Sequence, residues 1–201
     1  MKIVCVGRNY ADHAKEMGND VPAEPLIFLK PPSSLISSGE PIVLPPQSQE
    51  VHFEGEIGVF VGKRLQRATP DAAKAGIAGL APANDVTARD LQRKDSQWAR
   101  AKGFDTFCPV GTATSGVGQL DALELVTRVN GEVRQRARSS EMIFPIAAVL
   151  SYISHIMTLE PGDLVLTGTP AGVGRLVSGD EVEVEIVGVG KVRNSVLGIG
   201  G

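Results

Sequence analysis

Apolar and polar residues alternate most regularly at residues 51–62, and this pattern predicts the best-defined strand of the chain. Its odd positions are mostly apolar, whereas its even positions include Glu54 and Glu56. Because successive strand residues point to opposite faces, the two glutamates lie on the same face of the strand. Shorter apolar runs between turn residues predict further strands at residues 2–7, 26–29, 40–46, 79–83, 164–167, 181–187 and 191–196.

Turn and capping signals separate these runs. Asn130-Gly131 is a strong two-residue turn signal and predicts a hairpin with a strand on either side. Thr87 and Asp90 have the spacing of a capping box, which predicts the start of a short helix. Together these elements indicate an α+β, β-rich fold with a mixed sheet, in which residues 1–201 form a single domain. Further helices are expected at residues 8–17, where the helix is short, and at residues 70–78 and 143–159.

The composition is that of a globular protein with an ordinary core, with 201 residues of which 42% are hydrophobic. A net charge of −3 without a basic cluster argues against a nucleic acid or membrane partner. We find no signal peptide and no apolar stretch of membrane-spanning length, so we expect a cytoplasmic protein. Cys5 and Cys108 stand outside any Cys/His cluster, which indicates two reduced thiols in the core.

Glu54 and Glu56 are candidate metal ligands, together with Asp85, which follows the predicted strand at residues 79–83. Neighbouring carboxylates in a buried strand repel each other, so either one stays protonated or a cation lies between them. Three oxygen ligands without a His or Cys cluster favour a hard cation such as Mg²⁺ or Mn²⁺ over zinc. The alternative is a solvated strand face, as we expect for the glutamates at residues 181–187.

His13 and Glu16 are three residues apart on a predicted helix, so their side chains are neighbours. A carboxylate beside a histidine orients the ring and makes it a usable general base, although such a pair is also ordinary on a protein surface. Lys102 lies among apolar residues, where a semi-buried ammonium would meet a substrate carboxylate. The alternative is a surface lysine whose stem alone is buried.

Arg89 and Gln92 share one face of a predicted helix, so they either border the metal or form a solvated helix face. The glycine-rich loop at residues 168–174 lacks the ending of a phosphate-binding loop. We therefore expect a structural turn in which Thr169 and backbone amides face the substrate. His155 lies in an apolar predicted helix, and we expect it in the core or at an interface.

Six short sequence blocks follow one another along almost the whole chain. They are GRNYADHAKE at 7–16, FLKP at 28–31, EGEIGV at 54–59, NDVTARDLQ at 84–92, AKGFD at 101–105 and LTGTPAGVG at 166–174. In this order, the blocks together resemble the fumarylacetoacetate hydrolase family, although each one alone is unspecific. The chain is similar to the short, single-domain branch, which includes acylpyruvate hydrolases, oxaloacetate decarboxylases and hydroxyheptadienedioate isomerases.

The resemblance implies a β-rich roll with a few short helices, and usually a homodimer. By the motif match it implies that Glu54, Glu56 and Asp85 hold Mg²⁺, for which Mn²⁺ or Ca²⁺ can substitute. It also implies a small 2-oxo acid as the substrate. The other site residues that it implies are the water-activating pair His13 and Glu16, the catalytic and substrate-binding Lys102, and the substrate-binding Arg89, Gln92 and Thr169.

We therefore expect a metal-dependent hydrolase that cleaves the C–C bond of a 2,4-dioxo acid, such as an acylpyruvate or fumarylpyruvate, to pyruvate and a carboxylic acid. Such an enzyme needs a base that activates water and a cation that stabilises the pyruvate enolate. Oxaloacetate decarboxylation and hydroxyheptadienedioate isomerisation need the same enolate, so they stand as alternatives. Outside enzymes, the alternatives are a metal- or oxo-acid-binding protein without turnover and a structural domain that binds no metal.

Overall fold

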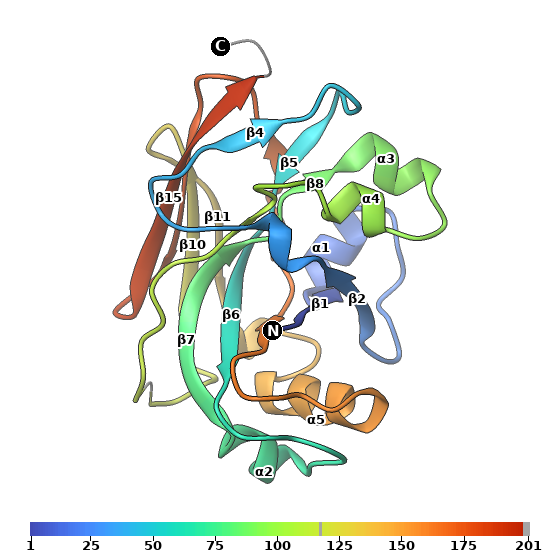
Figure 1. Ribbon diagram of the computed structural model, residues 1–201, viewed down its shortest axis with the longest axis vertical. Coiled ribbons are helices and arrows are strands. Elements are labelled where there is room, and N and C mark those ends of the chain that lie inside the picture. Colours follow the sequence, from blue (N-terminus) through green and yellow to red (C-terminus); the bar gives the residue numbers. More distant parts are fainter. Residues whose placement is uncertain (117, 199–201) are drawn as a thin grey trace.

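The computed structural model of the protein describes residues 1–116 and 118–198, so residues 117 and 199–201 of the predicted domain lie outside the described part. One five-stranded mixed sheet is built from β1 (Ile3–Gly7), β2 (Leu26–Lys30), β6 (Gly55–Val61), β7 (Ile77–Asn84) and β12 (Leu164–Leu166). Its strand order is β2-β1-β12-β6-β7, in which β1 and β12 are parallel (Figure 1). The β-rich mixed sheet that the sequence predicts is confirmed.

A second five-stranded sheet packs against the first and encloses the main core. Its strands are β4 (Ile42–Leu44), β10 (Glu124–Val129), β11 (Glu132–Arg138), β14 (Glu181–Ile186) and β15 (Gly190–Gly198). Their order is β11-β10-β14-β15-β4, so the strand predicted at residues 40–46 forms an edge of this sheet. Apolar residues of both sheets, such as Val59 and Val184, form one buried cluster with residues of the helix α5 (Ile146–Ile156).

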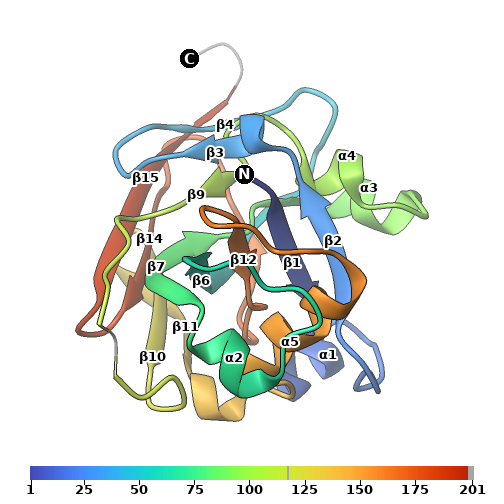
Figure 2. The same cartoon turned by 60° about the horizontal axis from the view of Figure 1, so that its bottom comes forward.

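Short strands and short helices surround the two large sheets. Figures 1 and 2 show α3 and α4 grouped together, apart from α2 and α5, which lie at another end of the molecule. A three-stranded sheet joins β5 (Val51–Phe53), β8 (Thr87–Ala88) and β13 (Gly174–Arg175), and β3 (Leu35–Ile36) pairs with β9 (Cys108–Pro109). The remaining helices are α1 (Ala11–Glu16), α2 (Pro70–Lys74), α3 (Arg89–Lys94) and α4 (Ala99–Lys102), with 3-10 turns at Pro32–Ser34 and Ser139–Glu141.

The strand predicted at residues 51–62 is in fact two strands, and the break lies at Glu54. The segment before the break, β5, belongs to the three-stranded sheet, whereas β6 belongs to the first large sheet. At the start of β6, a Cβ on Gly55 would lie only 1.9 Å from the hydroxyl oxygen of Thr127, so this close approach of the two sheets requires glycine. One continuous strand was therefore a wrong prediction.

The predicted hairpin turn is confirmed, whereas the predicted helix cap is wrong. Asn130 and Gly131 have φ angles of 53° and 81° and connect β10 to β11, as a tight hairpin turn requires. Thr87 lies in β8 instead of capping a helix. Its hydroxyl donates to the backbone carbonyl of Asp85 at 2.8 Å, which leaves no cap for α3. The side chain of Asp90 instead accepts hydrogen bonds from the segment before β5.

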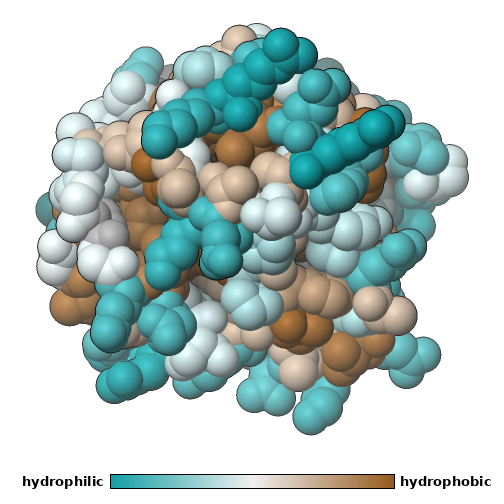
Figure 3. Space-filling model, turned by 90° about the horizontal axis from the view of Figure 1, so that it is seen from below, coloured by the Kyte–Doolittle hydropathy of each residue, from teal (hydrophilic) through white to brown (hydrophobic). Residues whose placement is uncertain are grey.

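His155 is exposed on α5, so it does not lie in the core, and its expected place at an interface stays a prediction. Figure 3 shows the molecule from the end where α2 and α5 lie, and its apolar side chains form patches between polar ones. Cys5 and Cys108 are buried and unpaired, as predicted. Within residues 1–116 and 118–198, no helix is long and apolar enough to cross a membrane.

Candidate metal centre and active-site cavity

Glu54, Glu56 and Asp85 converge where the three-stranded sheet meets the first large sheet. Glu54 occupies the break between β5 and β6, Glu56 is the second residue of β6, and Asp85 directly follows β7. The backbone N–H of Asp85 donates to the carbonyl of Glu54 at 2.8 Å, which ties the two chain segments together. One carboxylate oxygen of each residue lies within 4.8 Å of the other two, and Glu54 and Glu56 are only 4% and 1% exposed. This burial rules out the solvated alternative.

Three buried cations surround two of these carboxylates. The Lys102 ammonium donates to Glu54 Oε2 at 2.8 Å and to Asp85 Oδ2 at 2.6 Å. Lys30 donates to Asp85 Oδ1 at 2.7 Å, and the Arg89 guanidinium donates to Glu54 Oε1. Lys102 and Arg89 are each 2% exposed, so neither is the solvated residue of the alternative interpretations. Loss of one partner would leave a buried charge uncompensated, which is strongly destabilising.

The surroundings of Glu54 and Glu56 shift the pKa values of the two side chains in opposite directions. Burial alone raises the pKa of Glu54, but the charges of Lys102 and Arg89 outweigh burial and hold that pKa well below its usual range. Burial also raises the pKa of Glu56, and here the neighbouring Asp85 and Glu54 carboxylates raise it further. Burial lowers the pKa of Lys102, but Asp85 and Glu54 more than compensate, so its pKa lies above the usual value. The ammonium therefore stays charged.

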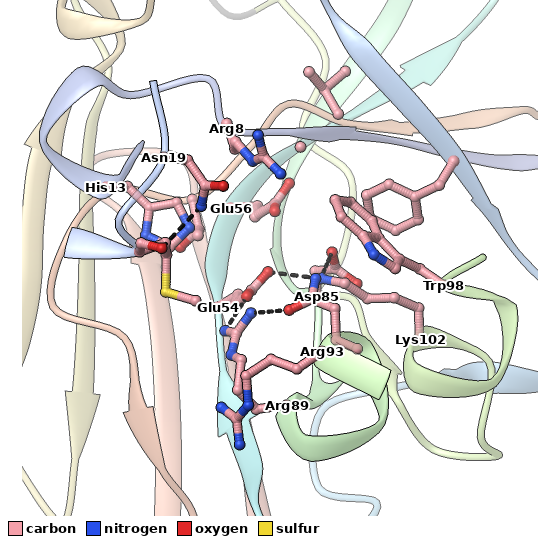
Figure 4. Close-up of a pocket in the computed structure, with 16 residues that line it drawn as sticks. Arg8, His13, Asn19, Glu54, Glu56, Asp85, Arg89, Arg93, Trp98 and Lys102 are labelled. Carbon is pink, nitrogen blue, oxygen red and sulfur yellow. Dashed lines mark hydrogen bonds and ion pairs between the residues drawn. The ribbon is translucent and has the colours of Figure 1, made fainter. Parts of the chain in front are cut away.

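This donor set fits a hard divalent cation. Carboxylate oxygens are the ligands that Mg²⁺ and Mn²⁺ prefer, and three of them converge here from rigid strand ends. One Glu56 oxygen accepts a hydrogen bond from the Gly168 N–H at 2.7 Å, which leaves the other free. The raised pKa of Glu56 also reports a concentration of negative charge that a cation would relieve. Figure 4 shows the three carboxylates facing the same cavity.

His13 and Glu16 form the pair that the sequence predicts. The Nδ1 atom of His13 lies 3.3 Å from Glu16 Oε2 on α1, and His13 is 5% exposed. The Glu16 carboxylate also accepts the N–H of Gly172 at 3.1 and 3.2 Å, so the loop after β12 holds it in place. Because Nδ1 faces Glu16, the Nε2 atom is the nitrogen that remains for a ligand. Figure 4 shows His13 and Lys102 on opposite sides of the carboxylates.

One cavity of about 300 Å³ brings most of the predicted site residues together. Of the predicted site residues, Glu16 alone does not line the cavity. Its carboxylate instead contacts His13, which does line it. Apolar and aromatic side chains share the remaining wall with Arg8, Asn19 and Arg93. The lining residues are Val6, Gly7, Arg8, His13, Met17, Asn19, Phe28, Glu54, Glu56, Asp85, Arg89, Gln92, Arg93, Trp98, Lys102 and Thr169.

The sequence interpretation missed several residues of this cavity. Arg8 lines it with a φ angle of 60°, a left-handed conformation that is uncommon outside glycine and concentrates at functional sites. Arg93 also lines it, but its guanidinium is paired with Glu50. Trp98 packs edge-on against Phe28, with ring centroids 5.4 Å apart. The Gly-Arg-Asn turn after a strand was the one available signal for Arg8.

The glutamates of β14 provide an internal comparison with the site. Glu183 and Glu185 alternate with buried Val and Ile, as predicted, and their side chains are 16% and 18% exposed. Both form ion pairs with Arg128 and Lys191 at the surface, and no buried cluster of carboxylates includes them among the described residues. The same alternation of glutamates therefore gives an ordinary surface ion-pair network when no third carboxylate is brought near.

Fold and site together define a β-rich protein with a buried carboxylate cluster suited to a divalent cation. The family model for the fumarylacetoacetate (FAA) hydrolase C-terminal domain matches residues 2–197. The chain belongs to the fumarylacetoacetate hydrolase family, whose members are enzymes of hydrolase, isomerase and tautomerase types.

Named relatives cover nearly the whole chain. The mitochondrial oxaloacetate tautomerase FAHD1 of Mus musculus is 46% identical over 200 residues, which are 96% of this chain and 90% of that protein. The crystal structure of 2-hydroxyhepta-2,4-diene-1,7-dioate isomerase from Mycobacterium marinum has a TM-score of 0.91 and 46% identity, covering 100% of this chain and 75% of that one. Fumarylpyruvate hydrolase from Pseudomonas aeruginosa, in complex with Mn²⁺ and pyruvate, has a TM-score of 0.93 and 35% identity, with coverages of 98% and 89%.

Proposed function

We propose that this protein is a Mg²⁺- or Mn²⁺-dependent hydrolase that cleaves a 2,4-dioxo acid to pyruvate and a carboxylic acid. One observation carries the proposal: the buried carboxylates of Glu54, Glu56 and Asp85 share a cavity with His13, which is backed by Glu16. The carboxylates supply a cation site, and the histidine supplies a base at the opposite side of the same cavity. Both are needed when water attacks a carbonyl and an enolate leaves.

The cationic wall of the cavity binds the acidic end of the substrate. Lys102, Arg89 and Arg8 place positive charge around a space that a 2-oxo acid would fill, and Thr169 adds a hydroxyl. A bound divalent cation would act there as a Lewis acid toward the carboxylate and oxo oxygens of the substrate. Two of the three ammonium hydrogens of Lys102 bond Glu54 and Asp85, which leaves the third for the substrate carboxylate.

His13 and Glu16 perform the proton transfers. His13 takes a proton from a water molecule, while Glu16 stabilises the charged ring and Gly172 holds Glu16. The resulting hydroxide adds to the C4 carbonyl, the C3–C4 bond breaks, and its electron pair passes into the enolate of pyruvate. Return of a proton to C3 completes pyruvate, and C4 leaves as the carboxylic acid. The P. aeruginosa fumarylpyruvate hydrolase, with its Mn²⁺ and pyruvate, supports this assignment.

Oxaloacetate tautomerisation is a second candidate activity, and the identity of 46% to the murine oxaloacetate tautomerase favours it. Tautomerisation, oxaloacetate decarboxylation and hydroxydienoate isomerisation all pass through an enolate, but none of them needs an attacking water. They use the carboxylate cluster and Lys102 in the same way. The His13–Glu16 pair is the feature that favours hydrolysis over these reactions.

The test is the rate of ultraviolet loss of acetylpyruvate, with oxaloacetate measured in parallel, first in Mg²⁺ and then in EDTA. We expect metal-dependent loss of acetylpyruvate, and the ratio of the two rates ranks hydrolysis against the oxaloacetate reactions. The Glu56→Gln variant serves as the matched control, because it keeps the side-chain shape and removes one charged ligand. Turnover of oxaloacetate alone would transfer the assignment to the second candidate, and turnover that persists in EDTA would contradict metal dependence.

A further inference from the structure

We infer that Gln135 is a positioning residue that fixes the direction of the Thr169 hydroxyl, so that this hydroxyl donates its hydrogen to a carboxylate in the cavity. Gln135 lies on β11, is 1% exposed and does not line the cavity, so it acts through Thr169. The inference rests on the proposed function in one respect: it assumes that an acidic substrate binds beside Thr169.

The orientation of the Gln135 amide follows from its neighbours. The backbone N–H of Gly55 donates to Gln135 Oε1 at 3.0 Å, and Gln135 Nε2 donates to the carbonyl of Pro170 at 2.8 Å. An N–H group can only donate and a carbonyl can only accept. If the oxygen and nitrogen of the amide were exchanged, its amino group would face the N–H of Gly55 and its oxygen would face the carbonyl of Pro170, and both hydrogen bonds would be lost. The amino group of Gln135 therefore faces the loop that carries Thr169.

That amino group determines what the Thr169 hydroxyl can do. Gln135 Nε2 donates to Thr169 Oγ1 at 2.8 Å, so the hydroxyl is an acceptor on its protein side. Its own hydrogen is free to point into the cavity, which Thr169 lines. A hydroxyl that presents a donor prefers an anionic acceptor, and the bond it accepts strengthens the bond it donates. Thr169 is thereby set to bind a carboxylate rather than a cation or an amine.

A β-bulge brings Gln135 into this position. Thr127 pairs with Gln135 and Arg128 pairs with Val133, so Arg134 is an extra residue without a partner on β10. Bulges of this kind redirect side chains and are frequent beside active sites. The carbonyl of Arg134 packs against Gly172, where a Cβ would lie 2.2 Å away, so the bulge and the loop fit together only with glycine at that position.

The same amide also links the two halves of the site. Gly55, whose N–H it accepts, lies between Glu54 and Glu56, whereas Thr169 lies on the loop that follows β12. One buried side chain therefore sets the position of a substrate-binding hydroxyl relative to the strand that carries two of the carboxylates. Mispositioning of about 1 Å at such a point is enough to impair binding or catalysis.

The test is a double-mutant cycle read by calorimetric binding of oxalate to the Mg²⁺-loaded protein. Oxalate presents the two neighbouring oxygens of a 2-oxo acid and needs no turnover. In Gln135→Glu the ionised side chain, formed at a pH high enough to deprotonate it, offers acceptors alone, so the Thr169 hydroxyl turns its hydrogen toward it and away from oxalate. We expect Gln135→Glu to weaken oxalate binding roughly tenfold, and Thr169→Val to weaken it by a similar factor.

The combinations separate positioning from a merely structural role. With Thr169→Val, the change at Gln135 should add less than about a twofold loss, because there is no hydroxyl left to redirect. With Thr169→Ser, which keeps the hydroxyl, the roughly tenfold effect should return. The Mg²⁺ affinity should be nearly unchanged in all of them, and Arg136→Gln, an exposed neighbour on β11, should bind oxalate as the wild type does.

Equal losses of oxalate affinity in all three Thr169 backgrounds would overturn the positioning role. An absence of oxalate binding by the wild-type protein would overturn it as well. If Gln135→Glu does not fold, Gln135→Met, which also lacks a donor, replaces it in the same double-mutant cycle. A cycle with the expected coupling in a protein that turns over neither acetylpyruvate nor oxaloacetate would support the role of Gln135 and reject the proposed function, so the two failures are distinguishable.

Discussion

The Nζ atom of Lys102 lies 2.6 Å from Oδ2 of Asp85, so an ammonium contacts a carboxylate that we propose as a metal ligand. A divalent cation and this ammonium would share the same buried oxygens. Binding of either one would weaken the other by electrostatic repulsion, while the carboxylate of the proposed substrate would draw the ammonium away from the cluster. On the proposed function, Lys102 would thereby couple binding of the metal to binding of the substrate.

Replacement of this lysine separates the two binding events. In Lys102→Met we expect Mg²⁺ to bind several-fold more tightly, because a competing buried charge is removed, and KM to rise by about tenfold or more. Calorimetry measures the first effect and steady-state kinetics the second. Lys94→Met, at an exposed position of α3, is the control. Weaker Mg²⁺ binding with an unchanged KM would show that Lys102 supports the ligands and does not contact substrate.

Glu56→Gln should stabilise the metal-free protein at neutral pH. Burial and the Asp85 and Glu54 charges raise the Glu56 pKa, so ionisation of Glu56 costs stability. That cost is absent below the unfolded-state pKa and grows as pH rises toward the raised folded-state value. Scanning calorimetry in EDTA at neutral pH should show a higher Tm for Glu56→Gln, by a few degrees, with the difference vanishing near pH 4.

The same variant should lose the stabilisation that Mg²⁺ gives to the wild type. A cation that binds only the folded state raises Tm in proportion to the logarithm of its concentration, and Glu56→Gln removes one of three charged ligands. We therefore expect millimolar Mg²⁺ to raise the wild-type Tm and to leave that of the variant unchanged. An equal Mg²⁺-induced shift in both proteins would exclude Glu56 as a ligand.

Hydrolysis should depend on His13 and Glu16 more than the oxaloacetate reactions do. The two side chains lie 3.3 Å apart, and we propose that they supply the base for water, which decarboxylation does not need. We expect His13→Ala or Glu16→Gln to reduce acetylpyruvate hydrolysis by roughly 10²- to 10⁴-fold, and oxaloacetate decarboxylation by less than about tenfold. Equal loss of both activities would count against water activation by this pair.

Gly172→Ala should damage both stability and hydrolysis. Gly172 has a φ angle of 98°, its Cβ would lie 2.2 Å from the Arg134 carbonyl, and its N–H holds Glu16. Gly179→Ala is a matched control, since Gly179 has a φ angle of 95° but nothing within 4 Å of a Cβ. We expect Gly172→Ala to be less stable than the control by roughly 1–3 kcal/mol in urea unfolding, and to lose hydrolysis selectively.

Local signals predicted those parts of the fold that local chemistry determines. The Asn130-Gly131 turn is one example, because two residues with positive φ are enough to define a hairpin. The break at Glu54 was not predictable in this way, since the alternation of polar and apolar residues continues through it without change. At this break the backbone of Gly55 lies against Thr127, which is distant in sequence. Pattern alone does not reveal such a tertiary contact.

The residues of the site show the same difference between local sequence signals and tertiary contacts. Glu54 and Glu56 share a strand pattern, and His13 and Glu16 share a helical spacing, so their proximity followed from the sequence. Gln135 carries no comparable signal, because its partners Gly55 and Thr169 are 80 and 34 residues away. Its one distinguishing mark is an amide at an inward position of a strand, opposite Thr127.

The parallel pairing of β1 with β12 also has a consequence for how the protein is made. Lys2 and Asp163, at the start of this pairing, are 161 residues apart and are joined by a backbone-to-carboxylate hydrogen bond of 2.6 Å. While the chain emerges from the ribosome, the edge of β1 that pairs with β12 therefore stays unpaired until β12 has been synthesised. The loop with Thr169 is synthesised after β12, so the cavity that Thr169 lines is not complete before that point. Contacts between strands so distant in sequence form slowly, so the edge of β1 that binds β12 is exposed to aggregation, or to shielding by a chaperone, until β12 arrives.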